Sequence, residues 1–128
     1  MIRHFKKFEG SPNGKNKNSA RITLSPRRFF ALNAKAHLIL GRPDAVELFF
    51  DDHERLVGML ACDPLKRNAF RIRKEKGKEY RVIYAATFCR HFSISTDRTV
   101  LFDLVDVTKD GMLVLDLKNG IRIGRGSR

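Results

Sequence analysis

The chain has 128 residues, of which 42% are hydrophobic, enough for one globular domain with its own core. Its formal net charge is +12, from 26 Lys or Arg against 14 Asp or Glu. The apolar runs are too short for a membrane-spanning helix, and the basic N-terminus lacks the apolar stretch of a secretory signal. A membrane protein is therefore not expected. Cys62 and Cys89 lack metal-ligand spacing and are predicted to be reduced, partly buried thiols of a cytoplasmic protein.

The positive charge is concentrated in three segments. Residues 1–28 contain eight Lys or Arg and one Glu (+7), residues 66–81 contain eight and two Glu (+6), and the last eleven contain four and no acid (+4). The apolar-rich segments between them are mildly acidic. Such segregation is typical of a protein that binds a polyanion, although a solvated surface is the plain alternative. We therefore expect a nucleic acid as the partner.

Composition divides the chain into an arm, a domain and a tail. Residues 1–20 contain EGSPNGKNKNSA, which has almost nothing to bury and predicts a flexible basic arm. Residues 21–117 are predicted to form a single globular domain. Residues 118–128, KNGIRIGRGSR, are predicted to be a basic, Gly-rich tail.

The first part of the domain alternates extended and helical patterns. Two short strands flank the turn SPRR, in which Pro26 supplies the fixed φ that such a turn accepts. A helix of about two turns follows, and then two strands joined by the polar turn DDHER. The predicted ranges are strands 20–24 and 29–32, helix 33–40, and strands 46–50 and 56–61.

The second part repeats this order. A hairpin of alternating apolar and basic residues surrounds the charged tip KEKGKE. Phe88, Cys89 and Phe92 lie on one stripe of the following helix, and Asp110-Gly111 is a strong hairpin signal. The predicted ranges are strands 69–73 and 80–84, helix 85–92, and strands 100–104 and 112–117.

These parts predict an internal repeat. In register, Asn33 matches Ala85, Leu40 matches Phe92 and Val46 matches Val100. One unit alone has too little apolar surface to be stable, whereas two units that share a closed sheet do not have this problem. The sequence thus predicts a mainly β fold with short helices (α+β), a β-barrel built from two β-hairpin–helix–β-hairpin half-repeats, 21–63 and 68–117.

This arrangement resembles the SpoVT/AbrB swapped-hairpin family, in the tandem form of MraZ-like proteins. The segment RVIYAATFCRHFSISTDRTVLFDLVDVTKDGMLVLDL has the family's spacing from strand through helix to Asp-Gly hairpin. The first half-repeat keeps Leu40-Gly41 at the helix end but has Asn33 where the family usually has a proline. The resemblance implies a swapped-hairpin barrel, sequence-specific DNA binding and transcriptional regulation.

The resemblance also implies that basic residues near the first hairpin and the strand-to-helix turn of each half face DNA. On this chain these positions are Arg21, Arg27, Arg28 and Lys35 in the first half, and Arg71, Arg73, Arg81 and Arg90 in the second. The arm would add salt-dependent phosphate contacts through Lys6, Lys7, Lys15 and Lys17. Taken singly, each of these residues is equally well explained as a solvated side chain.

The aromatic pair Phe29-Phe30 offers a second way to bind nucleic acid. Exposed rings stack on the bases of single strands. Neighbouring strand residues point to opposite faces, however, so at least one of the two is expected in the core.

The sequence offers no arrangement that predicts an enzyme. The four histidines are scattered, and Cys89 and His91 point to different helix faces. Asp51-Asp52-His53-Glu54 could bind a divalent ion, but its place between two strands favours a hairpin turn. We predict no catalytic residue, no metal and no cofactor.

Two alternatives to double-stranded DNA remain open at this point. One is an RNA or single-strand binder. The other is a protein–protein module, either antitoxin-like or an inhibitory subunit, with an acidic partner. A tandem chain can close its sheet alone, so the sequence is compatible with a monomer and with a homodimer.

Overall fold

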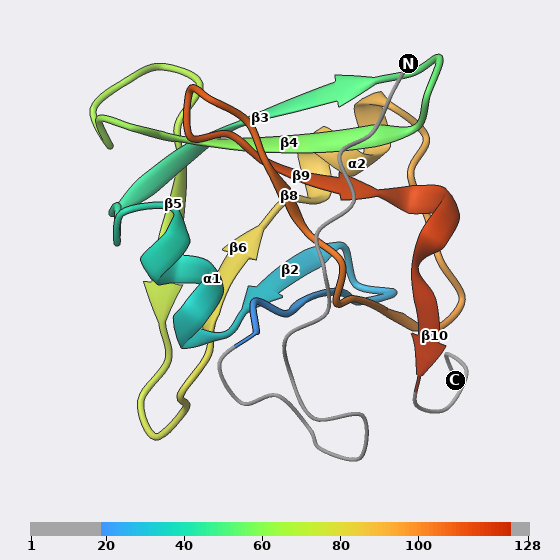
Figure 1. The fold of residues 1–128 in the computed structure, drawn as a ribbon, viewed down its shortest axis with the longest axis horizontal. Helices are drawn as coiled ribbons and strands as arrows, with labels where there is room; N and C mark the ends of the chain where they lie inside the picture. Colours follow the sequence, from blue (N-terminus) through green and yellow to red (C-terminus); the bar gives the residue numbers. More distant parts are fainter. Residues whose placement is uncertain (1–18, 124–128) are drawn as a thin grey trace.

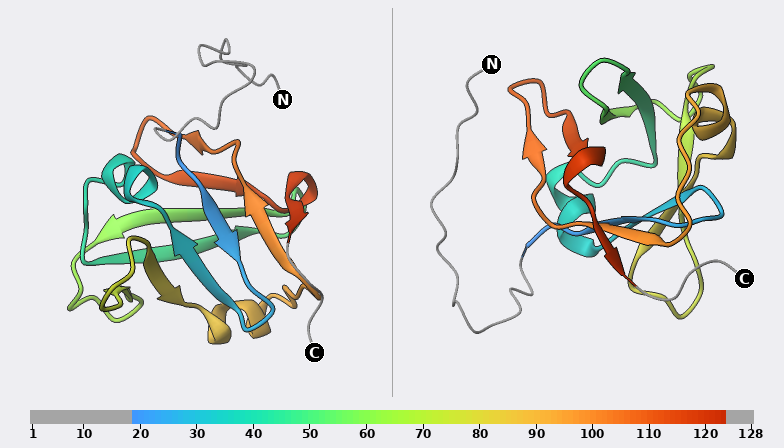
Figure 2. Two further views of the ribbon diagram at one scale, coloured as in Figure 1. Left: turned by 90° about the horizontal axis from the view of Figure 1, so that it is seen from below. Right: turned by 90° about the vertical axis from the view of Figure 1, so that its right-hand side faces the viewer.

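The computed structural model describes residues 19–123, so most of the predicted arm and the last five residues lie outside it. Within this range ten strands form one antiparallel sheet that curls into a half-barrel, accompanied by two short α-helices (Figures 1 and 2). The mainly β, α+β class is thereby confirmed. The elements are β1 (Ile22–Leu24), β2 (Phe29–Leu32), α1 (Ala34–Ile39), β3 (Ala45–Asp51), β4 (Leu56–Cys62), β5 (Phe70–Lys74), β6 (Arg81–Tyr84), α2 (Ala86–His91), β7 (Thr99–Phe102), β8 (Asp106–Val107), β9 (Leu113–Asp116), the 3₁₀ helix η1 (Leu117–Asn119) and β10 (Ile121–Ile123).

The core lies inside the curl of the sheet. Alternate residues of the strands point inward, so Ile22 and Leu24 of β1 and Phe30 and Leu32 of β2 are buried while their neighbours are not. The strand order runs β10-β7-β1-β2-β6-β5-β3-β4-β9-β8, which leaves β10 and β8 as the two edges. Neither helix in residues 19–123 is long and apolar enough to cross a bilayer.

Strand partners are exchanged between the two half-repeats. β1 of the first half pairs with β7 of the second, and β5 of the second half pairs with β3 of the first. β2 pairs with β6, and β4 pairs with β9. An approximate twofold axis between β2 and β6 therefore relates these ladders, and neither half has a complete sheet of its own.

The ladders also correct the alignment of the halves. Directly paired residues of two antiparallel strands point to the same face of the sheet. Phe30 and Ile83 are such a pair and both are buried, so a twofold axis that keeps buried residues equivalent passes between them and makes Ile83 the counterpart of Phe30. Ile22 pairs with Phe102, and its counterpart Phe70 pairs with Val46. Val46 therefore corresponds to Phe102, two residues beyond the Val100 of the sequence alignment. The longer turn after α2 hides this shift, because either alignment preserves the alternation of apolar residues.

The last strands differ from the prediction. The expected hairpin between strands 100–104 and 112–117 is wrong: β7 pairs with β1 and β10, while β9 pairs with β4 and β8. The Asp110-Gly111 turn joins the short β8 to β9, with Gly111 at a φ of 85°. Residues 117–123, most of which were predicted as tail, form η1 and β10 instead.

Asn33 explains how α1 begins without the proline that is usual in the resembling family. Its side-chain oxygen accepts a hydrogen bond from the Ala36 amide at 2.9 Å, as an N-cap does. The same oxygen accepts from the Arg21 amide at 3.0 Å, and the amide nitrogen donates to the Ser19 carbonyl at 2.8 Å. One side chain thus begins the helix and holds the start of the domain.

The two thiols should differ in reactivity. Cys89 is fully buried on the inner side of α2 and Cys62 is half-buried at the end of β4, both as free thiols. Burial is the main cause that raises the pKa of each thiol, which keeps both largely protonated at neutral pH. We expect a thiol reagent to label Cys62 in the native protein and Cys89 only after unfolding. Mass mapping of the labelled peptides checks this, and equal native labelling would contradict the packing of α2.

Candidate nucleic-acid interface

The outer face of the half-barrel is formed by β1, β2, β6 and β5. One row of paired residues crosses it, running through Thr23, Ala31, Val82 and Arg73. Thr23 and Ala31 are half-buried and Arg73 is exposed, whereas Val82 is only 1% exposed, so the row lies on the side away from the curl of the sheet but is inaccessible at Val82. Figure 2, left, looks onto this face, with β1, β2 and β6 in front of β3 and β4.

An aromatic pair lies at one end of this face. Phe29 pairs with Tyr84 across the β2–β6 ladder, with ring centroids 6.0 Å apart, and Tyr84 is 52% exposed. Phe30 is fully buried, as expected for one of the two phenylalanines. The Tyr84 hydroxyl donates to Glu75 at 2.6 Å, and this hydrogen bond raises the pKa of Tyr84. Tyr84 was not among the predicted site residues, although the alternation in YRVIY was the signal that could have found it.

The β1–β2 turn carries the first pair of cations. Arg27 is exposed and Arg28 is half-buried. Arg28 has a φ of 67°, a left-handed conformation that is unusual for any residue but glycine or asparagine. Its amide donates to Ser25 at 2.9 Å and its carbonyl accepts from Ala85 at 3.0 Å, so the turn is held against the start of α2. Among the described residues, the buried Nε of Arg28 has no hydrogen-bond partner.

The β5–β6 hairpin carries a second set of cations. Lys74, Lys76 and Lys78 are all exposed around its tip, where Lys74 Nζ donates to the Lys78 carbonyl at 2.9 Å. Arg81 lies at the base of the hairpin, opposite Lys74 and Leu32. The twofold axis relates this hairpin to the β1–β2 hairpin. The three lysines were part of the +6 segment but were not among the predicted site residues.

The other predicted cations divide between the same two ends. Arg21 lies opposite Asn33, and Lys35 is in the first turn of α1, so both are close to the Arg81 end. Arg71 lies beyond the Ile72–Ile83 pair, toward Tyr84 and the β1–β2 turn. Arg90 is exposed in the last turn of α2. The arm residues Lys6, Lys7, Lys15 and Lys17 lie outside the described range.

The predicted residues therefore form two basic ends rather than one cluster. Because β2 and β6 are antiparallel, the β1–β2 turn lies at one end of their ladder and the β5–β6 tip beyond the other. Figure 1 shows this separation, with the β5–β6 tip at the lower left and the β1–β2 turn pointing to the right. A ligand that contacts both ends has to be long and negatively charged along its length.

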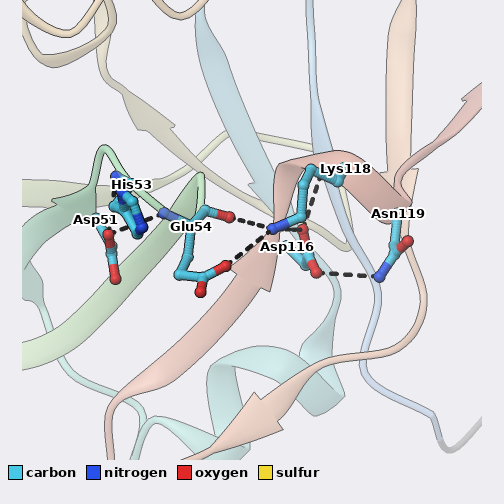
Figure 3. Close-up of polar contacts among 6 residues, drawn as sticks. All are labelled: Asp51, His53, Glu54, Asp116, Lys118 and Asn119. Atoms are coloured by element: carbon cyan, nitrogen blue, oxygen red, sulfur yellow. Dashed lines mark hydrogen bonds and ion pairs between the residues drawn. The ribbon is translucent and has the colours of Figure 1, made fainter. Parts of the chain in front are cut away.

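The acidic segment 51–54 forms a turn. The Asp51 carboxylate accepts hydrogen bonds from the His53 and Glu54 amides, each at 3.0 Å (Figure 3). These hydrogen bonds engage the Asp51 carboxylate, which would otherwise be a ligand for a cation. Within residues 19–123 no cluster of His, Cys, Asp and Glu is suited to a metal ion. The structure thus favours the hairpin interpretation of DDHER.

Comparison with known proteins gives no match: no family model, curated protein or solved structure is similar to this chain. The candidate interface thus rests on geometry and charge alone.

Proposed function

We propose that the protein binds double-stranded DNA through the outer sheet face, with one basic turn at each end of the β2–β6 ladder. The observation that supports this most is the placement of Arg27 and Arg28 at one end and Lys76 and Lys78 at the other, related by the twofold axis. Phosphate contacts by such side chains supply most of the affinity of DNA-binding proteins.

The spacing of the two ends suits a duplex. Four residue steps separate Arg28 from Leu32, which pairs with Arg81, so the levels of Arg28 and Arg81 are about 13 Å apart along β2 at ~3.3 Å per residue, and Lys76 and Lys78 lie further out. The major groove of DNA is about 12 Å wide, so side chains from the two ends can reach phosphates on both of its sides. A duplex also has local twofold symmetry, which a protein with a twofold axis can match on a near-palindromic site.

The exchange of strands between the halves supports the resemblance to swapped-hairpin regulators. In this proposal the chain is a transcriptional regulator, and Arg27, Arg28, Arg71 and Arg73 are the candidates for contacts with base edges, since Arg is suited to guanine. Selection of bound duplexes from a random pool tests this role. A shared motif is expected, and recovery of unrelated sequences would limit the protein to non-specific binding.

Fluorescence anisotropy of a labelled duplex tests the binding itself. We expect micromolar or tighter binding at low salt and a steep loss as salt rises, because the cations displace condensed counterions. Absence of binding at low salt and micromolar protein would exclude the proposal.

A second candidate function is binding of a single strand, which the exposed Phe29–Tyr84 pair favours. Stacked bases would quench tyrosine fluorescence, which is easy to follow because the chain has two Tyr and no Trp. If a single strand competes better than the duplex and quenches this signal, this second function replaces the first.

Arg28→Gly separates the function of this side chain from its effect on stability. Glycine relieves the left-handed backbone, which costs a residue with a side chain about 1–2 kcal/mol. We therefore expect an unchanged or higher melting temperature together with weaker DNA binding. Lys109→Gln, in the exposed β8–β9 turn, removes one charge far from the interface and should bind like the wild type. Wild-type affinity in Arg28→Gly would show that Arg28 makes no contact with DNA.

A further inference from the structure

Charge is unevenly divided between the two sides of the half-barrel. Residues 44–68 and 103–118 contain β3, β4, β8, β9 and the segments next to them, and we call this part the acidic wing. It has ten Asp or Glu and five Lys or Arg, a net charge of −5, whereas the rest of residues 19–123 has three acids and fourteen Lys or Arg, a net charge of +11. Figure 1 shows β3 and β4 at the top and β2 below them, on the other side of the curl.

The outer face of the acidic wing has an apolar patch at its centre. Phe49, Gly58 and Val114 are paired in one row across β3, β4 and β9, and Phe49 is 41% exposed. The neighbours of this row in β4 and β9 point into the core, so the row lies on the outside. Met112 lies over Gly58, since a Cβ on this glycine would be 2.5 Å from the Met112 Sδ. The half-buried apolar residues on this face are Leu56, Leu60, Met112 and Val114.

Acidic side chains surround this patch. Four acids pair with residues of the patch and therefore point to the same side of the sheet. They are Glu47, paired with Leu60, Asp51 and Asp116, both paired with Leu56, and Asp106, paired with Val114. Glu47 and Asp116 have Lys66 and Lys118 as ion-pair partners, and both lysines are included in the net charge of −5. An apolar centre with a charged rim is the usual composition of a protein–protein interface.

The charge of the acidic wing selects among its possible occupants. A net charge of −5 disfavours a nucleic acid or an anionic membrane, which are themselves negative. A second copy that used the same face would bring two negative wings together. Charge complementarity therefore favours a basic partner, and the exposed ring of Phe49 favours one with apolar side chains.

We propose that the outer face of the acidic wing binds a short basic segment of a partner protein, with apolar side chains at its centre and Lys or Arg at its ends. The apolar side chains cover Phe49 and Met112, whose thioether adapts to the shape of the partner. The cations approach Asp51 and Asp106. Burial of the Phe49 ring gives affinity, and the opposite charges give selectivity. This inference goes beyond the DNA interface and does not depend on it.

A peptide with blocked ends and the sequence Lys-Lys-Leu-Phe-Leu-Lys-Lys tests the proposal. Titration of the full chain, followed by calorimetry and amide-resolved NMR, should give saturable one-to-one binding at submillimolar concentration. Shifts are expected in residues 47–60 and 112–116, and binding should weaken as salt rises. Peptides with Glu in place of Lys, or with Ser in place of Leu and Phe, should bind at least about tenfold more weakly.

Phe49→Ser tests the apolar part of the site. It should weaken binding of the peptide by about tenfold, because the ring loses the area that the peptide covers. Tyr80→Ser is the matched control, since Tyr80 is a 37% exposed ring outside the acidic wing, and this variant should bind like the wild type.

Asp51→Asn with Asp106→Asn tests the charged part. The amides keep the shape of the side chains and, at position 51, an oxygen for the hydrogen bonds of the turn. Binding should weaken by about fivefold and depend less on salt. Glu79→Gln with Asp97→Asn removes two exposed acids outside the wing and should bind like the wild type. Should Phe49→Ser unfold, this pair of variants still decides the question.

Several outcomes would overturn the proposal. They are no saturable binding at millimolar peptide, equal binding of the three peptides, wild-type affinity in either interface variant, and shifts outside the acidic wing. Occupation of the face by the chain itself would also overturn it. Shifts of Phe49 and Met112 on dilution of the free protein would indicate a second copy, and the same shifts in Lys6→Gln with Lys7→Gln would indicate the chain's own first residues.

Discussion

Neutralising both basic turns is expected to remove most of the affinity for duplex DNA. Arg27→Gln with Arg28→Gln, or Lys76→Gln with Lys78→Gln, should each weaken binding by at least about tenfold, and the fourfold variant by much more. The reason is counterion release. The logarithm of the binding constant changes by about 0.9 per phosphate contact for each tenfold change in salt, so near 0.1 M salt one contact raises the binding constant roughly eightfold relative to 1 M salt. Anisotropy titrations over a salt series give the affinity and the slope, which should fall by about 3–4 in the fourfold variant.

The control for this experiment removes charge outside the two basic turns. Lys109→Gln with Arg67→Gln changes two exposed cations in the β8–β9 turn and the β4–β5 connection. Both affinity and slope should stay close to those of the wild type. If this control is as weak as the interface variants, net charge alone decides binding. If only one turn affects binding, the duplex contacts a single end of the ladder.

Phe30→Ala should cause the largest loss of stability among single changes in the β1–β2 hairpin. Phe30 is fully buried and is the largest of the fully buried side chains. Truncation of a buried phenylalanine costs about 3–5 kcal/mol, a large part of the ~5–15 kcal/mol that stabilises a typical domain. Urea unfolding followed by circular dichroism measures the free energy of unfolding.

Phe29→Ala is the matched control, because it removes the same ring from the neighbouring residue. Phe29 is half-buried on the outer face, where its ring contacts that of Tyr84. Loss of this aromatic contact should lower the free energy of unfolding by about 0.5–1.5 kcal/mol, in addition to the small contribution of the apolar area that Phe29 buries. Equal losses in the two variants would contradict the assignment of faces. Reduced quenching by a single strand in Phe29→Ala alone would support stacking.

Local patterns predicted most of the fold. Alternation identified β2, β3, β5 and β6, and the apolar stripe of Phe88, Cys89 and Phe92 identified α2. Local patterns did not predict β10, because Ile121–Ile123 is only three residues long and follows a glycine. Its strand conformation depends on pairing with Thr99–Leu101, far away in the sequence, and on Gly120 fitting against Val100. A one-dimensional pattern does not contain such a contact.

The candidate site was predicted in composition but not in arrangement. Arg27 and Arg28 are at the expected turn, and charge counting identified the second basic segment. Their position at opposite ends of one ladder follows from the β2–β6 register, which sequence spacing leaves open. The alternation in YRVIY could have placed Tyr84 on the outer face, but its pairing with Phe29 also depends on that register.

The most direct test of the account is amide-resolved NMR of the protein with a short duplex. A duplex bound across both basic turns should cause shifts in the β1–β2 turn around Arg28 and in the β5–β6 tip around Lys76, at the same duplex concentration. The β8–β9 turn around Lys109 should not change. Shifts at only one of the two basic turns, or the largest shifts in the β8–β9 turn, would contradict a duplex bound across both ends of the β2–β6 ladder.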